Sequence, residues 1–375
     1  MNSDVFKIAA EIISKANHEK PADQVLRETF KRYREIAPFD ATEISRMVFM
    51  YYRWQEWVAG EKTSEDKLRR ARDWATRFET NPAFFSSEEL RAKAVPPWAL
   101  NEVAVTDDWL KSLQGESRLW LRARRGQGKN LANKLGHCRA AGEGALRDTL
   151  QYSGTEDLFR SPEFHAGEFE LQDIASQAVG LICDPKPGET WWDACAGEGG
   201  KLLHLSDLME NKGLIWASDR AAWRLQKLKR RTSRAKAFNY RSELWDGGAK
   251  LPTKTKFNGI LVDAPCSGVG TWQRNPHARW TTTLQDVHEL GEVQKKLLSH
   301  VANSVKPGGK LIYAVCTLTN SETNLVADAF EAQFKDFKPL PVLNPLALEK
   351  PAAARVWIWP QDSRGNGMFV AAWQR

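Results

Sequence analysis

Cysteine is scarce in this sequence. Five cysteines occur among 375 residues, without the spacing of metal ligands: Cys138, Cys183, Cys195, Cys266 and Cys316. An odd and dispersed set predicts reduced thiols, as in a cytoplasmic protein, and gives no reason to expect a disulfide framework or a bound metal.

Long apolar runs are absent as well. No uncharged apolar stretch reaches the roughly 18 residues that a membrane-spanning helix needs, so we expect no membrane segment. Residues 1–7 lack a charged segment followed by an apolar run, so we expect no signal peptide. The sequence also shows no internal repeat and no low-complexity tract.

The charge is only mildly unbalanced. The 54 Lys and Arg residues exceed the 47 Asp and Glu residues, which gives a net charge of +7. This excess is compatible with an enzyme that acts on nucleic acid, but it does not establish one.

The N-terminal part has the apolar period of helices. Within residues 4–60 three apolar stripes recur at helical spacing: Val5, Ile8, Ile12 and Ala16; Leu26, Phe30 and Tyr33; and Ile44, Met47, Val48 and Tyr51. Asp40 followed by Glu43 resembles a capping box at the start of the third helix. The pattern alone predicts a small helical bundle.

The pattern becomes mixed in the middle of the chain. Residues 64–78 are expected to form a helix that ends in a turn near Asn81-Pro82. Residues 119–124 alternate as a half-buried strand should, and residues 130–141 are expected to be helical.

From residue 171 onward, strand and helix patterns alternate, which predicts an α/β fold with a parallel sheet. The expected strands are residues 189–194, 213–218, 235–240, 258–263, 309–315, 354–359 and 367–373. A long amphipathic helix is expected over residues 284–305.

The rest of the chain is organised around residues 192–201, in which a strand, a glycine-rich turn and a helix follow one another. Glycine allows the backbone to approach a ligand closely, and a helix start presents unpaired N–H groups. The glycines alone are equally compatible with an ordinary turn between a strand and a helix that binds no ligand. Asp219 ends the next strand, close to the spacing at which a carboxylate meets a ribose hydroxyl in doubly wound folds.

Several reactive side chains fall at or just past the carboxyl ends of expected strands: Asp193, Asp219, Asp263, Cys266 and Cys316. Ligands of open α/β sheets bind at that edge. A lone cysteine at a strand end is usually buried and inert. Two cysteines beside a carboxylate and a possible cofactor turn fit one particular chemistry.

That chemistry is methylation of a pyrimidine at carbon 5. A thiolate that adds to carbon 6 activates carbon 5, which can then accept a methyl group from S-adenosylmethionine (SAM). A base must afterwards remove the proton at carbon 5 so that the thiolate can leave. On RNA, the target base must first be turned out of its stack.

The motifs also carry a family resemblance. Residues 193–201, the Asp-Ala-Pro-Cys-Ser-Gly motif at residues 263–268, and the Tyr-x-x-Cys motif at residues 313–316 with Glu322 resemble the Sun/RsmB-type RNA cytosine-5 methyltransferases. Further similar stretches precede and follow them, at residues 161–177, 275–294 and 367–371, and residues 1–60 are similar to the NusB-like helical domain of the ribosomal RNA branch.

The resemblance implies a SAM-dependent methyltransferase with a Rossmann-like domain. It implies that Cys316 attacks carbon 6, that Cys266 assists proton removal and release, and that Asp263 lies between cofactor and cytosine. It implies cofactor contacts for Cys195, Ala196, Gly197, Glu198, Gly199, Gly200, Lys201, Asp219, Arg224, Asp246 and Asp263. Asp246 is the choice for the acid near the adenine.

The expected domains are a NusB-like RNA-binding domain at residues 1–62, a connector at 63–115, a small α/β RNA-binding subdomain at 116–169 and the methyltransferase domain at 170–375. RNA contacts are expected from Arg122, Arg124, Arg125 and Lys129, and base stacking from Trp272 and Trp280. Most of the eight basic residues between Arg220 and Lys236 are expected on a solvated helix face.

Three readings remain open beside the preferred one, which is 5-methylcytosine formation in small-subunit ribosomal RNA by a monomeric enzyme. The substrate could be transfer RNA. The chain could be a non-catalytic RNA-binding assembly factor, because Val315 and Thr317 depart from the family pattern beside Cys316. A nicotinamide dehydrogenase is the weakest reading, since it explains neither cysteine.

Overall fold

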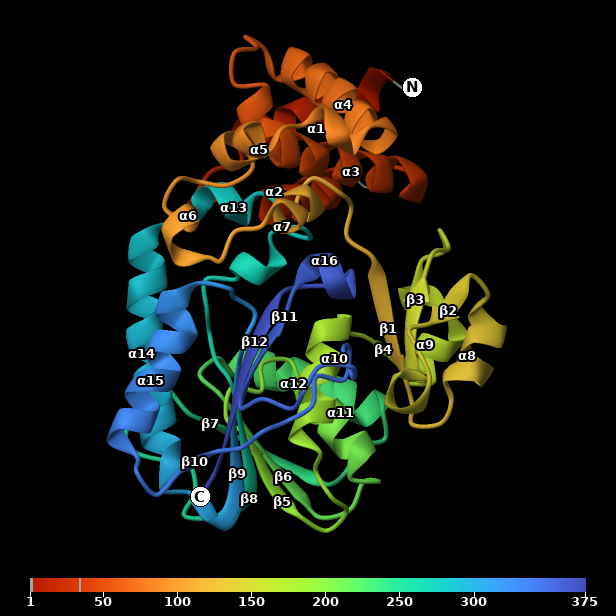
Figure 1. Cartoon of the computed structure of the whole chain (residues 1–375). Helices are drawn as coiled ribbons and strands as arrows, with labels where there is room; N and C mark the ends of the chain where they lie inside the picture. The colour runs from red at the N-terminus through yellow and green to blue at the C-terminus, as the bar shows by residue number, and fades with distance from the viewer. Residues whose placement is uncertain (1–2, 34) are drawn as a thin grey trace. The chain divides into compact units, whose positions relative to one another are not determined.

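A computed structural model describes residues 3–33 and 35–375, which form two compact units (Figure 1). One unit contains Met1–Ser117 and Gly268–Asp286, and the other contains Arg118–Ser267 and Val287–Arg375. The four-part division expected from the sequence stays a prediction. No helix in the described part of the chain is long and apolar enough to cross a membrane.

The first unit is helical. Its elements are α1 (Ser3–Lys15), α2 (Ala22–Arg32), α3 (Pro38–Trp54), η1 (Gln55–Trp57), α4 (Ser64–Thr80), η2 (Pro82–Phe84), α5 (Ser87–Lys93), α6 (Ala99–Glu102), α7 (Asp107–Ser112), η5 (Val269–Thr271) and α13 (Ala278–Thr281). The three apolar stripes fall on α1, α2 and α3 and supply the core, as predicted. The helix expected at residues 64–78 is α4, and it ends at the predicted turn.

The capping box expected at Asp40 is wrong. The helix begins two residues earlier, because Pro38 occupies its first turn, where its fixed φ suits a helix and its missing N–H costs nothing. Asp40 therefore lies in the first turn, where a carboxylate favours the helix dipole without capping it.

A segment distant in sequence completes the helical unit. In residues 268–286, the fully buried Arg279 donates to the carbonyl oxygens of Ala94 and Leu113 at 2.9 and 2.8 Å. Trp272 is fully buried too, which excludes the base stacking that the sequence suggested for it. The half-buried Trp280 donates its indole N–H to the Tyr52 carbonyl at 2.7 Å.

The second unit begins with a small antiparallel sheet in the order β2-β3-β1-β4. Its elements are β1 (Leu119–Ala123), α8 (Gly128–Leu135), β2 (Cys138–Ala140), η3 (Gly144–Leu146), β3 (Thr149–Tyr152), η4 (Leu158–Arg160), α9 (Pro162–His165) and β4 (Phe169–Leu171). The strand expected at residues 119–124 is confirmed as β1, but four of its five residues are buried, because it lies between β3 and β4.

The helix expected over residues 130–141 is wrong at its C-terminal end. α8 stops at Leu135, where Gly136 adopts a φ of +62° that other residues rarely adopt. Cys138 to Ala140 then pair with β3.

A larger sheet dominates the second unit, in the order β10-β12-β9-β8-β5-β6-β7, with β11 paired to β12. Its strands are β5 (Thr190–Asp193), β6 (Leu214–Asp219), β7 (Tyr240–Leu244), β8 (Phe257–Asp263), β9 (Val305–Val315), β10 (Lys338–Pro339), β11 (Arg355–Ile358) and β12 (Met368–Gln374). β7, β6, β5, β8 and β9 are parallel, and β12 is antiparallel to β9. The predicted α/β class with a Rossmann-like sheet is confirmed.

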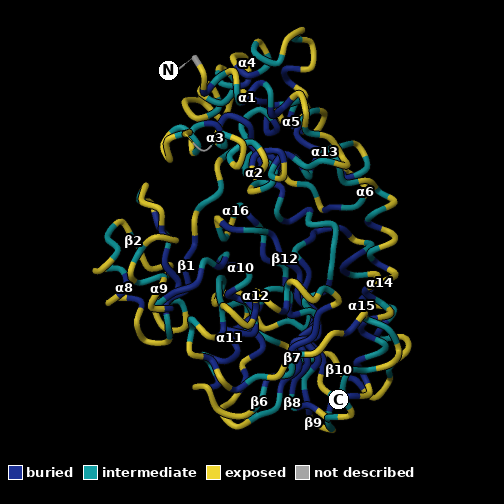
Figure 2. Tube along the Cα trace, turned by 180° about the vertical axis from the view of Figure 1, so that it is seen from behind, coloured by how far each residue is buried: buried dark blue, intermediate teal, exposed yellow. Residues whose placement is uncertain are grey.

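Helices cover both faces of this sheet (Figure 1). They are α10 (Ile174–Cys183), α11 (Gly200–Leu208), α12 (Ala222–Arg234), α14 (Leu284–Ala302) and α15 (Asn324–Gln333). The domain also contains the short helices η6 (Asn320–Glu322) and α16 (Pro360–Ser363). Alternate strand residues point to opposite faces: Trp191 packs with α10 and α11, whereas Trp192 packs with the layer of α14 and α15. Both faces of the central strands are therefore buried, and β8, β9 and β12 appear dark blue in Figure 2.

Six of the seven predicted strands of this domain lie close to the observed ones. The strand predicted at residues 235–240 is wrong, since β7 starts only at Tyr240. Residues 235–239 instead end α12 and form the turn after it, where Lys236 adopts a φ of +54°.

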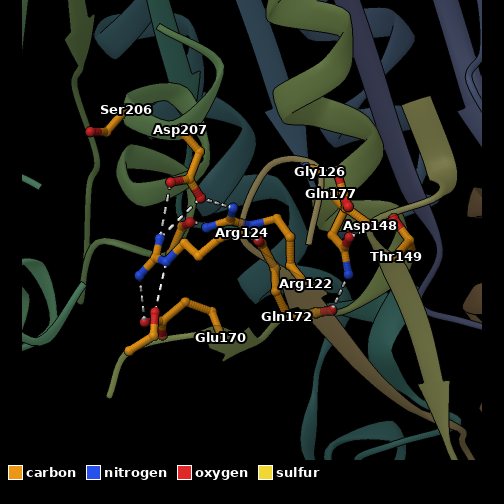
Figure 3. Close-up of polar contacts among 12 residues, drawn as sticks. Arg122, Arg124, Gly126, Asp148, Thr149, Glu170, Gln172, Gln177, Ser206 and Asp207 are labelled. Atoms are coloured by element: carbon orange, nitrogen blue, oxygen red, sulfur yellow. Dashed lines mark hydrogen bonds and ion pairs between the residues drawn. The ribbon is translucent and has the colours of Figure 1, made fainter. Parts of the chain in front are cut away.

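A buried network of charges joins the small sheet to the larger domain (Figure 3). Arg122 on β1 and Arg124, which directly follows that strand, both pair with Asp207 on α11. Glu170 on β4 pairs with Arg231 and Arg234 on α12 at 2.8 and 2.7 Å. We refer to these six residues as the charged seam.

The charged seam corrects the RNA contacts predicted for two arginines. The Arg122 side chain is 3% exposed and the Arg124 side chain 18% exposed, and both are held by acids of the same unit. The exposed Arg125 pairs with Glu210 at 2.7 Å, and Lys129 is exposed. Arg231 and Arg234 likewise serve the seam rather than a solvated face.

Candidate active site

A cavity of about 490 Å³ opens at the carboxyl ends of β5, β6, β8 and β9. Open α/β sheets bind ligands at this edge, at the point where the strand order reverses. Here the order reverses beside β5, the first strand of the sheet in the chain. The cavity wall contains every site residue expected from the sequence except Gly199: Cys195, Ala196, Gly197, Glu198, Gly200, Lys201, Asp219, Arg224, Asp246, Asp263, Cys266 and Cys316. The roles assigned to them remain predictions.

The glycine turn is shaped by its backbone. Gly197 and Gly199 adopt φ values of +54° and +87°, which only glycine adopts readily. A Cβ on Gly199 would lie 2.9 Å from Leu228, so this glycine allows α12 to pack closely rather than lining the cavity. The Gly197 N–H donates to Asp219 at 3.0 Å, which fixes the turn against the end of β6.

Asp219 and Glu198 differ in exposure. Asp219 is buried, accepts a second hydrogen bond from the Ala221 N–H at 2.8 Å and lies 3.8 Å from the Arg224 guanidinium. Glu198 turns outward, as its charge suggests, and pairs with Lys227 at 2.7 Å. Asp246 lines the cavity beside Trp245 and follows β7, which lies on the other side of β6 from β8 and β9, the strands that precede Cys266 and Cys316.

Lys201 and Asp263 form an ion pair in the cavity wall. The Lys201 ammonium lies 2.7 Å from Asp263, and its side chain is only 11% exposed. Burial alone would lower the pKa of Lys201, but the carboxylate of Asp263 outweighs it and the pKa is raised. The lysine therefore keeps its charge at neutral pH and brings a fixed positive charge to the site.

The two cysteines of the strand ends are in contact, with their Sγ atoms 3.3 Å apart. The thiol of Cys266 lowers the pKa of Cys316 by hydrogen bonding, against the effect of burial, and Lys201 also favours the thiolate. In contrast, burial and the nearby Asp193 raise the pKa of Cys195. Of these two thiols, that of Cys316 therefore ionises more readily than that of Cys195.

Asp193 was not among the predicted site residues, although its place at a strand end was noted. It is 1% exposed, and among the described residues neither carboxylate oxygen has a hydrogen-bonding partner of good geometry. Burial, reinforced by the charge of Asp263, raises the pKa of Asp193 to about 7. A buried, unsatisfied carboxylate behind a cavity is a natural partner for a cationic ligand group.

Asp193→Asn should remove a pH dependence of stability. Because the folded state holds this proton more tightly than the unfolded chain, Asp193 favours folding at low pH, and that contribution disappears as the pH rises from about 4 to about 7. Raising this pKa from 3.8 to about 7 corresponds to about 4 kcal/mol, so at roughly 2–4 °C per kcal/mol we expect the variant to melt on the order of 10 °C higher than the wild type at pH 8. Thermal unfolding from pH 5 to 8 measures this, and equal pH slopes for the two proteins would refute it.

A buried glutamate behind the cysteines was noticed in the sequence only through a motif. Glu322 is fully buried and accepts hydrogen bonds from residues that follow both cysteines. The signal in the sequence is a lone acid within an otherwise apolar and hydroxyl-rich stretch, residues 315–327, which looks like an ordinary helix start.

The residues beside Cys316 that depart from the family pattern still pack in the core or form hydrogen bonds. Val315 is buried in β9, and the Thr317 hydroxyl lies 2.9 Å from that of Ser267. The Thr323 hydroxyl donates to the Thr319 carbonyl at 2.6 Å. The differences at Val315 and Thr317 therefore give little support to a non-catalytic factor.

Comparisons with known proteins identify the family of this chain. The model of the family 16S rRNA methyltransferase RsmB/F matches residues 180–374, more than half of the chain. Probable ribosomal RNA small subunit methyltransferase B of Synechocystis is 35% identical over 225 residues, which are 58% of this chain and 50% of that protein. The mouse tRNA (cytosine(72)-C(5))-methyltransferase NSUN6 is 34% identical over 45% of this chain and 38% of its own.

Solved structures share the fold. The crystal structure of PH0851 has a TM-score of 0.78 at 23% identity and covers 100% of both chains. NSun6 from Pyrococcus horikoshii with SFG has a TM-score of 0.62 at 18% identity, over 72% of this chain and 93% of that one.

The sheet order and the cavity at its carboxyl edge define a Rossmann-like methyltransferase fold. The chain belongs to the 16S rRNA methyltransferase RsmB/F family. It spans about half the length of the curated relatives that it matches.

Proposed function

We propose that this protein transfers a methyl group from SAM to carbon 5 of a cytosine in RNA. The contact between Cys266 and Cys316, in one cavity with the glycine turn, carries the proposal. Two thiols at such a distance suit a reaction that needs one sulfur to attack and a second group to take a proton.

The cavity fits SAM. Asp193 and Asp263 offer negative charge to its ammonium and sulfonium groups, Asp219 offers a carboxylate to the ribose hydroxyls, and the glycine turn allows the backbone to come close. When bound, SAM supplies the methyl group as an electrophile.

The residues then act in order on the cytosine. The Cys316 thiolate forms a bond to carbon 6, which places the ring electrons on carbon 5, and Asp263 holds the ring edge so that the addition is favoured. Cys266 first releases its own thiol proton to solvent, and after methylation of carbon 5 its thiolate takes the proton from that carbon. The electrons return to the ring, the sulfur–carbon bond breaks and Cys316 leaves as a thiolate.

Small-subunit ribosomal RNA is the first substrate that we propose, since the bacterial relatives are named for it. Transfer RNA is the second, because a mouse relative is named for that activity. We further propose that the protein acts in the cytoplasm as a monomer, which rests on the family resemblance.

A trapping assay tests the proposal with wild type, Cys316→Ala, Cys266→Ala and the double variant. Each is incubated with cellular RNA and SAM and run on a denaturing gel. We expect Cys266→Ala alone to accumulate a protein–RNA adduct, since the adduct forms but is not released, and Cys316→Ala to abolish methyl transfer. The sequence of the trapped RNA identifies the substrate.

Absence of any adduct, together with no methyl incorporation by the wild type into ribosomal or transfer RNA, would overturn the proposal. Cys138→Ala is the matched control, since Cys138 lies on β2 outside the cavity wall. Its methyl transfer should equal that of the wild type.

A further inference from the structure

Glu322 is a buried acidic residue that no cation of the described residues pairs with. It ends η6, its exposure is 0%, and none of the described lysine, arginine or histidine residues pairs with it. A buried carboxylate without a counter-ion is costly unless hydrogen bonds satisfy it. An apolar residue would fill the same space more cheaply, so the charge calls for an explanation.

Hydrogen bonds satisfy both carboxylate oxygens. One oxygen accepts the backbone N–H of Ser267 at 2.8 Å and the side-chain amide of Gln294 at 3.0 Å. The other accepts the hydroxyls of Thr319 at 2.8 Å, of Thr317 at 3.1 Å and of Ser267. Five donors fill the roughly four lone-pair positions of an ionised carboxylate, which fixes its orientation.

The donors come from both cysteine loops. Ser267 directly follows Cys266, and Thr317 directly follows Cys316. Their hydroxyls also lie 2.9 Å from each other. One carboxylate thus accepts hydrogen bonds from the residue that follows each cysteine.

A second layer fixes this arrangement. Gln294 on α14 also donates to the carbonyl of Pro265, the residue before Cys266, at 2.9 Å. The hydroxyl of Tyr313 on β9 lies 2.9 Å from the Gln294 side-chain oxygen and 2.6 Å from the Glu322 backbone oxygen. Networks of this kind are rigid when every member is satisfied.

We propose that Glu322 is a positioning residue that keeps the two cysteine thiols in contact by clamping the residue after each of them. The proposal rests on the proposed function, because the contact matters for a reaction that uses both thiols. Glu322 acts through Ser267 and Thr317, which donate hydrogen bonds to its carboxylate.

The clamp has an electrostatic consequence that can be measured. The hydrogen bond from Cys266 is the main cause that lowers the pKa of Cys316. The charged groups around this thiol are Lys201 on α11, Asp263 on β8 and Glu322 on η6. A variant that keeps all three charges but loosens the clamp should therefore raise the pKa of Cys316 by separating the thiols.

Thr317→Val and Ser267→Ala are such variants, because each removes a hydroxyl donor and no charge. Thr323→Val is the matched control: Thr323 is equally buried and adjacent to Glu322, but its hydroxyl donates to a backbone carbonyl. The alkylation rate of Cys316 by iodoacetamide is followed by mass spectrometry against pH, without RNA or SAM. The kcat and KM of methyl transfer are measured in parallel.

We expect the alkylation midpoint of Cys316 to move to higher pH in both clamp variants and to stay in place in Thr323→Val. We expect kcat to fall by about 10- to 100-fold, as for a misplaced reactive group, with KM for RNA and SAM unchanged. An unchanged alkylation midpoint in both clamp variants would refute the proposal that Glu322 keeps the two thiols in contact. If the wild type transfers no methyl group, the proposed function fails, whereas the alkylation profile still decides on the clamp.

Discussion

Lys201→Met should reduce methyl transfer by about 100- to 1000-fold, the usual cost of removing a preorganised charged donor from an active site. Without the ammonium, Asp263 has lost its partner at 2.7 Å, and it faces the nearby carboxylate of Asp193. The loss also raises the pKa of Cys316, because Lys201 favours its thiolate. Methyl incorporation into RNA and the pH profile of Cys316 alkylation measure the two effects.

The same change should cost about 3–5 kcal/mol of stability, since it leaves one half of a buried ion pair unpaired. The double variant Lys201→Met/Asp263→Asn should recover much of this stability and none of the activity. Lys212→Met is the matched control, because Lys212 is 66% exposed and pairs with Glu210 at the surface. A double variant as unstable as Lys201→Met would show that the pairing is not the cause.

Glu170→Gln should destabilise the second unit by about 3–5 kcal/mol. Glu170 has a side chain only 2% exposed, and it neutralises Arg231 and Arg234 in the charged seam. Arg231 also donates to the Glu198 carbonyl of the glycine turn at 3.2 Å, so we expect weaker SAM binding as well. Denaturant unfolding and calorimetric titration with SAM are the measurements.

The stability that Glu170 contributes should depend on pH. Burial would raise the pKa of Glu170, but the charges and hydrogen bonds of the two arginines outweigh it and the pKa is lowered. The stabilisation is therefore present above the ordinary value of 4.5 and is lost as the pH falls below it. Glu210→Gln, at exposed pairs with Lys212 and Arg125, should change the stability far less, because exposed ion pairs contribute little. A similar loss of stability in both variants would speak against the seam.

The sequence predicted the larger sheet and its ligand edge well, because both depend on local patterns. Buried parallel strands are short apolar runs, and the motif residues follow them directly, so Asp219, Asp263, Cys266 and Cys316 converge as expected. Errors arose where a local pattern competed with backbone geometry, as at Gly136, which ends α8 early.

Side chains with long-range partners could not be predicted. Arg122 and Arg124 look like RNA-binding residues in a basic stretch, and only the fold brings Asp207 to them from 85 and 83 residues away. Trp272 stands beside a motif loop in sequence but is buried in the helical unit. These contacts form only in the tertiary structure, so they cannot be predicted from composition or from the periodicity of apolar residues.

The helical unit is discontinuous in sequence, since residues 268–286 supply its buried Trp272 and Arg279. During synthesis the ribosome releases α1 to α7 long before this segment, and β1 to β8 emerge in between. The part of the chain that is made first therefore cannot complete its core until most of the parallel sheet has been translated. We expect nascent chains stalled before residue 268 to remain protease-sensitive in the helical unit, and those released beyond residue 286 to become resistant.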